Sequence, residues 1–183
     1  LEPIMAQGFA KRDAAEIKAD LISFFEARIK HHLSEKEVRY DLIDAVLTGE
    51  IGVVSSLVNR ALVLEKAKGE ESFKETVEAL SRVMNIAVKL ENEPKVSVEL
   101  FENDSEKALY NEYVAIKEQY ELTSDEGKQF ALLASLQGAI EKFFEDTMVM
   151  ADDESLRFNR LSVMKEVADL IKSFAFMNKV LVL

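Results

Sequence analysis

Residues that interrupt helices are scarce in this sequence. Its 183 residues include only 6 Gly and 2 Pro, so long segments run without an interior helix breaker. Along these segments apolar residues recur every three or four positions, the spacing that places them on one face of an α-helix. The pattern therefore predicts an all-α fold, a helical bundle of about seven helices.

The predicted helices follow one another with short breaks. They cover residues 11–33, 34–47 (with Ser34 as the N-cap), 52–68, 72–90, 104 or 105–121, 126–144 and 154–177. The last one has apolar residues on two faces, which indicates a central position. After the break at Pro94, the alternating Val96, Val98 and Leu100 are predicted to form a loop that pins apolar side chains, because a lone strand would have nothing to pair with. We expect an N-terminal helical part, residues 1–92, and a C-terminal helical part, residues 93–183, packed as one compact unit.

Cysteine is absent, which excludes thiolate metal sites and a cysteine nucleophile and is typical of a reducing, intracellular setting. No apolar run approaches the roughly 18 to 20 residues that span a bilayer. The first residues also lack the basic and apolar regions of a secretory signal. The chain begins with Leu1 instead of Met, so we expect a cytoplasmic protein that is a piece of a larger one, with no membrane partner.

Patterns typical of catalytic or metal centres are not found in the sequence. The two histidines, His31 and His32, are adjacent, and adjacent side chains on a helix point about 100° apart, so they cannot chelate one ion together. Phosphate-binding loops need glycines that this chain lacks. We interpret Asp152-Asp153-Glu154 as favourable charge at a helix N-terminus, with a Mg²⁺ site as the alternative. We therefore expect no catalytic centre, no metal site and no cofactor in this chain.

The net charge of −11 is the opposite of what is usual for a nucleic-acid-binding protein, but basic residues gather in two places. On the last predicted helix they fall within an arc of about 140°. This first group is Arg157, Arg160, Lys165 and Lys172. The second group, around the corner between the first two predicted helices, is Arg28, Lys30, His31, His32, Lys36 and Arg39.

Both basic groups are candidate RNA-binding surfaces, and Arg160 and Lys165 are the first candidates for RNA contact. An alternative for Arg157 is that it pairs with the acids before it or locks the helix start to Glu145 or Asp146. The alternative for the second group is an ordinary solvated turn. For Arg82, which has apolar neighbours, a helix-to-helix hydrogen bond is favoured over RNA contact.

The segment Asp153-Glu154-Ser155-Leu156-Arg157, followed by Asn159-Arg160-Leu161, resembles the DALR anticodon-binding domain of aminoacyl-tRNA synthetases. Glu154-Ser155 stands where that motif has Asp-Ala, which keeps an acidic residue and a small neighbour. Residues 143–153 are similar to the same region of the bacterial-type glycyl-tRNA synthetase β subunit. Further similar stretches, in family order, are Tyr40–Leu47, Arg82–Ile86, Leu100–Glu102 and Glu106–Leu109.

The resemblance implies a fold of the DALR anticodon-binding type and the C-terminal helical domain of the β chain in an α2β2 glycine–tRNA ligase. It implies that the chain binds the anticodon stem-loop of glycine tRNA and positions this tRNA for aminoacylation by the α subunit. ATP and Mg²⁺ would serve the parent enzyme, outside this chain. The implied partners are glycine tRNA, the α subunit and the remainder of the β subunit, and no DNA. An alternative that the acidic charge supports is a helical assembly module that holds the synthetase subunits and domains together.

Overall fold

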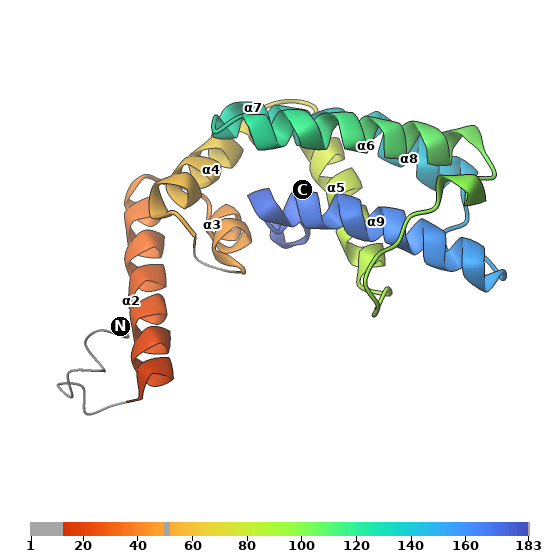
Figure 1. Ribbon diagram of the computed structural model, residues 1–183. Helices are drawn as coiled ribbons and strands as arrows, with labels where there is room; N and C mark the ends of the chain where they lie inside the picture. The colour runs from red at the N-terminus through yellow and green to blue at the C-terminus, as the bar shows by residue number, and fades with distance from the viewer. Residues whose placement is uncertain (1–12, 50–51, 183) are drawn as a thin grey trace.

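The computed structural model describes residues 13–49 and 52–182, and within these ranges it contains helices and no strand (Figure 1). This confirms the predicted all-α fold. The α-helices are α2 (Ala14–Glu35), α3 (Tyr40–Leu47), α4 (Val54–Ala67), α5 (Phe73–Ala87), α6 (Asp104–Leu122), α7 (Glu126–Ser135), α8 (Gln137–Asp146) and α9 (Glu154–Phe174). Two 3-10 turns are η1 (Val98–Leu100) and η2 (Met177–Lys179). None of the helices in the described ranges has the length and apolarity needed to cross a membrane.

Two predicted helices differ most from the structure, and the helices predicted to end at residues 90 and 177 end at Ala87 and Phe174. The sixth predicted helix, residues 126–144, is divided into α7 and α8 at Leu136, whose φ of −68° and ψ of −14° remain right-handed helical, so the chain bends without unwinding. Beside the bend, Gln137 Oε1 accepts a hydrogen bond of 2.9 Å from Thr76 Oγ1 of α5. Ser34 is not an N-cap, because α2 continues through it, and its hydroxyl donates to the carbonyl of Lys30 within the same helix.

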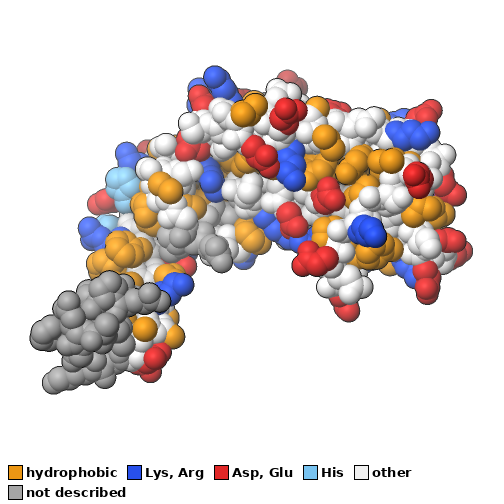
Figure 2. All heavy atoms as spheres, in the orientation of Figure 1, with side chains coloured by type: hydrophobic (Ala, Val, Ile, Leu, Met, Phe, Trp, Pro, Cys, Tyr) orange, Lys and Arg blue, Asp and Glu red, His pale blue; other side chains and the backbone are white. Residues whose placement is uncertain are grey.

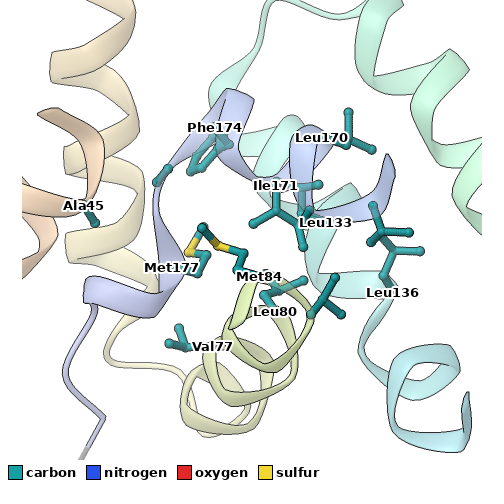
Figure 3. Close-up of a cluster of buried hydrophobic side chains, with 14 of the residues drawn as sticks. Ala45, Val77, Leu80, Met84, Leu133, Leu136, Leu170, Ile171, Phe174 and Met177 are labelled. Atoms are coloured by element: carbon teal, nitrogen blue, oxygen red, sulfur yellow. The ribbon is translucent and has the colours of Figure 1, made fainter. Parts of the chain in front are cut away.

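The hydrophobic core lies mainly between α5 and α9, the pair of helices that pack most extensively on each other. Figure 3 shows side chains of these two helices meeting those of α7, η2 and α3. The buried residues labelled there are Ala45, Val77, Leu80, Met84, Leu133, Leu136, Leu170, Ile171, Phe174 and Met177. Both parts of the chain contribute to this single core, while the boundary between residues 92 and 93 stays a prediction.

The helix α2 projects away from the bundle and packs against α3 and α4 (Figure 1). Ile29 and Leu33 are the buried residues of α2, and both lie in its last two turns. Further toward the N-terminus, Leu21, Phe24 and Phe25 are 43%, 59% and 48% exposed. Figure 2 shows hydrophobic side chains gathered on the visible surface of this helix.

The segment between α5 and α6 is a loop with the turn η1, as predicted, but polar contacts hold it in place. Asn159 of α9 accepts a hydrogen bond from the Ser97 N–H at 2.7 Å and donates one to the Ser97 carbonyl at 3.0 Å. The predicted pinning of apolar side chains applies to Val96, which packs on the core, whereas Val98 is 59% exposed.

Candidate nucleic-acid interface

The acidic residues before α9 start this helix. Asp153 is the N-cap, and its side chain accepts hydrogen bonds from the backbone N–H groups of Ser155 at 2.8 Å and Leu156 at 3.0 Å. Arg157 Nη1 donates to the carbonyl of Ala151 at 2.8 Å, and Arg157 Nη2 lies 3.6 Å from a carboxylate oxygen of Glu154. The segment that resembles the DALR motif therefore fixes the entry into α9.

Arg160, the first candidate for RNA contact, is only 7% exposed. Its Nε donates to Glu106 at 2.7 Å, its Nη2 donates to Glu102 at 2.8 Å, and its Nη1 donates to the Met148 carbonyl at 3.2 Å. Burial alone would lower the pKa of Arg160, but the hydrogen bonds and charges of Glu106 and Glu102 raise it above its usual value. RNA contact at Arg160 would require these ion pairs to break.

Glu106 connects this ion pair to the start of α6. Its carboxylate is 1% exposed and also accepts hydrogen bonds from the backbone N–H groups of Glu102 at 2.8 Å and Asn103 at 3.0 Å. The Asn103 side chain accepts from the Glu106 N–H in return, which completes a capping box. This buried polar network joins α9, α6 and the loop before α9, so its energetic role is in the fold.

Lys165 and Lys172 share one partner on α9. Lys165 Nζ lies 2.6 Å from both carboxylate oxygens of Asp169, and Lys172 Nζ lies 3.5 Å from one of them. The four basic residues predicted on α9 therefore do not form one free cationic surface. Arg157 holds the start of the helix, and Arg160 belongs to the buried network. Asp169 partly neutralises Lys165 and Lys172. RNA contact by these four residues stays a prediction.

The second basic group divides into paired and unpaired residues. Lys30 binds Asp44 at 2.6 Å, His31 lies 3.4 Å from Glu35, and Arg39 binds Asp41 at 2.6 and 2.8 Å. The other three are exposed, and no described residue forms a hydrogen bond or ion pair with their side chains. These three are Arg28, His32 and Lys36. Because they are four residues apart, they line up at the end of α2 and form a cationic stripe.

Asp41 joins the paired residues to the end of the described chain. Burial alone would raise the pKa of Asp41, but the hydrogen bonds from Arg39 and from the Leu181 N–H, the latter 2.6 Å long, hold it below its usual value. Arg39 Nη2 also donates to the Leu181 carbonyl at 2.6 Å. These bonds form a latch between the segment that opens α3 and the residues that follow η2.

Arg82 differs from its prediction. It is exposed, it forms no hydrogen bond with any described residue, and its guanidinium carbon lies 4.0 Å from the centre of the Phe144 ring on α8. The sequence signal for this surface is the spacing of Arg82 and Asn85 at i and i+3 on α5, with Lys89 two residues after the helix ends. In the described ranges, no group of three or more His, Asp or Glu residues is placed to hold a metal ion.

Residues 76–177, more than half of the chain, match the model of the DALR anticodon binding domain. The chain is 37% identical over 176 residues to the glycine–tRNA ligase beta subunit of Listeria monocytogenes (serotype 4a, strain HCC23), an alignment that covers 96% of this chain and 25% of the relative. The beta subunit of Bacillus subtilis (strain 168) is 40% identical over 166 residues, covering 89% of this chain and 24% of the relative. The chain thus spans about a quarter of the length of these relatives. The matched residues run from α5 to the start of η2, and the chain belongs to the family of DALR anticodon-binding domains.

Proposed function

We propose that this chain binds the anticodon stem-loop of glycine tRNA as part of a glycine–tRNA ligase. The observation that carries the proposal is the match of α5 to η2 to the anticodon-binding domain, together with relatives that are beta subunits of this ligase. We also propose that this enzyme is cytoplasmic and that the chain positions glycine tRNA for aminoacylation by an α subunit, as the sequence resemblance implies. ATP and Mg²⁺ would act in the complete enzyme, away from this chain.

We further propose that the cationic stripe of α2 makes phosphate contacts. An unpaired exposed cation can bind a phosphate without giving up another partner, whereas a paired cation must exchange one. Arg28 and Lys36 meet this condition, and the exposed His32 between them has a ring N–H that can donate a hydrogen bond to a phosphate. Lys165 and Lys172 could contribute after leaving Asp169, and Lys30, His31 and Arg39 flank the stripe.

Binding of the chain to glycine tRNA tests the function. The logarithm of the association constant should fall linearly with the logarithm of salt concentration, with a slope of roughly −2 to −3 for about three phosphate contacts. A tRNA with a different anticodon should bind more weakly. Equal affinity for both tRNAs, or no binding to glycine tRNA at low salt, would contradict the proposed function.

Charge reversal tests the stripe separately. Arg28→Glu combined with Lys36→Glu should weaken glycine tRNA binding by about tenfold or more and make the salt slope less negative. The matched control is Lys66→Glu combined with Lys74→Glu, which reverses two exposed lysines that have no described partner elsewhere on the chain. If both double variants bind equally well, the stripe is not the phosphate-binding surface, although the proposed function stands.

A second candidate function is assembly, and the exposed apolar face of α2 favours it. Leu21, Phe24 and Phe25 remain exposed on this helix, and the chain is about a quarter as long as its relatives. The candidate partner is the remainder of the beta subunit, whose apolar surface would cover this face.

Phe24→Ser combined with Phe25→Ser should abolish association with a beta-subunit fragment lacking this region. Loss of that association with intact tRNA affinity favours assembly, and loss of tRNA affinity alone favours RNA binding.

A further inference from the structure

A hollow of about 460 Å³ lies between the last turns of α5, the end of α8 and the loop before α9. Its volume falls within the range of small-ligand sites. The side chains that matter for its chemistry are Arg82, Asn85, Lys89, Phe144, Met148 and Met150. Two of them are cations, and no carboxylate is among the described residues that line the hollow. On a chain with a net charge of −11, this composition favours an anionic or electron-rich ligand.

Arg82 and Phe144 form a flat platform at one side of the hollow. The guanidinium carbon lies 4.0 Å from the ring centre, within the range of a cation–π contact. Phe144 is half-buried and packs against the core, so the ring has a fixed position. Arg82 is exposed, so the side of the guanidinium that faces away from the ring is accessible. Unstacked RNA bases stack on arginine planes of this kind.

Polar groups for a base edge and a phosphate stand beside the platform. Asn85 Oδ1 accepts a hydrogen bond of 3.1 Å from Asn178 Nδ2, so the carbonyl of this side chain is occupied and its amide hydrogens remain to donate. Lys89 is exposed, and its ammonium has no hydrogen bond or ion pair with a described residue. Met148 and Met150, 73% and 42% exposed, supply flexible apolar surface around the opening.

We propose that this hollow binds one unstacked nucleobase of an RNA loop. The base stacks on the side of the Arg82 guanidinium that faces away from Phe144, and the Phe144 ring packs against the other side. An acceptor on the edge of the base receives a hydrogen bond from the Asn85 amide, and Lys89 binds the adjacent phosphate. The inference rests on the proposed function, since the RNA is the anticodon loop, and it adds a site at which one loop base is held.

The test uses the 183-residue chain and an RNA hairpin with the anticodon stem-loop sequence of glycine tRNA. One hairpin is made for each loop position, with 2-aminopurine in that position, because its fluorescence reports whether the base is stacked. In the wild-type chain, binding should change the fluorescence at one loop position more than at the others. Affinity is measured in the same titrations.

Three variants separate stacking from charge and from apolar packing. Arg82→Lys keeps the charge and removes the plane, and Phe144→Leu keeps an apolar side chain and removes the ring. Each should lower hairpin affinity by about tenfold and remove the position-specific fluorescence change, since one stacked base typically contributes that much. Lys74→Ala, which removes an exposed lysine elsewhere on α5, should change affinity by less than about twofold.

The outcomes distinguish the inference from the proposed function. If the wild-type chain and all variants bind the hairpin equally and the fluorescence pattern is unchanged, the hollow does not hold a base and the inference is wrong, while the proposed function stands. If the wild-type chain does not bind the hairpin at all, the proposed function fails and the inference fails with it. Urea unfolding of each variant verifies that the loss of affinity is not a loss of fold.

Discussion

The helices α2 and α9 are nearly equal in length, with 22 and 21 residues, and both have the apolar spacing of an amphipathic helix. Eleven residues of α9 are buried, compared with two of α2. The difference comes from their neighbours: α9 packs against α5, α6 and α7, whereas α2 meets α3 and α4 near its C-terminal end. The apolar pattern thus predicts that a helix forms, but it does not predict which surface covers it.

The largest expected effect is the loss of an aromatic side chain from α9. Phe174 is 1% exposed, and Phe174→Ala should lower the free energy of unfolding by about 3–5 kcal/mol, because it removes buried apolar area and leaves a cavity. Phe24→Ala on α2 is the matched control and should change it by less than about 0.5 kcal/mol. Urea unfolding measures both, and equal losses would show that α2 is as well packed as α9.

The next effect concerns the buried network of α9. Arg160→Ala leaves the buried Glu106 carboxylate without its cation, and we expect a loss of about 3 kcal/mol in the free energy of unfolding. Lys165→Ala, which removes a more exposed ion pair on the same helix, should cost about 0.3–0.5 kcal/mol. If Arg160→Ala instead weakens glycine tRNA binding while its unfolding curve matches the wild type, Arg160 contacts RNA directly.

The stabilisation that the latch at Asp41 contributes should depend on pH. Its folded-state pKa is lowered, so its contribution is present above about pH 4, the unfolded-state pKa, and is lost as the pH falls through the folded-state value. Asp41→Asn should lower the free energy of unfolding by about 2 kcal/mol at pH 7, because hydrogen bonds to a charged group are lost. The gap between the two proteins should close below pH 4. A gap that stays constant down to pH 2 would exclude this linkage.

The smallest effects compare the two helix starts. Asp13 caps α2 and Asp153 caps α9. Asp153→Ala should lower the global free energy of unfolding by about 1 kcal/mol. Asp13→Ala should leave the global value unchanged and increase only local opening, since the first turns of α2 have no buried residue. Amide hydrogen exchange distinguishes local from global opening, and equal global losses would refute the difference drawn between α2 and α9.

Sequence periodicity was sufficient to predict most helices because local spacing determines which residues share a face. It failed at Leu136, where the chain bends beside a hydrogen bond between Gln137 and Thr76, residues 61 positions apart. It also failed at Ser34, which was predicted to be an N-cap, whereas α2 continues through this residue. Contacts between segments that are distant in the sequence help to decide where a helix bends or ends. Such contacts cannot be inferred from the periodicity of a single sequence.

The candidate site was harder to predict for the same reason. Helical spacing places the basic residues of α9 within one sector of the helix. It does not predict that Glu106, 54 positions before Arg160, forms a buried ion pair with it. Arg82 was missed because its apolar neighbours suggested burial, whereas its own side chain is exposed and stacked on Phe144. Periodicity describes one helix at a time, and a binding surface is made by several.

The latch has a consequence for the order of events during protein synthesis. The ribosome makes Asp41 140 residues before Leu181, which at typical elongation rates is a delay of roughly 10 to 30 s. During this interval α3 has been made, but the segment after η2 that later binds Asp41 has not. The buried face of α3 must stay open, or be covered by another surface, until Leu181 has been made and has left the ribosome.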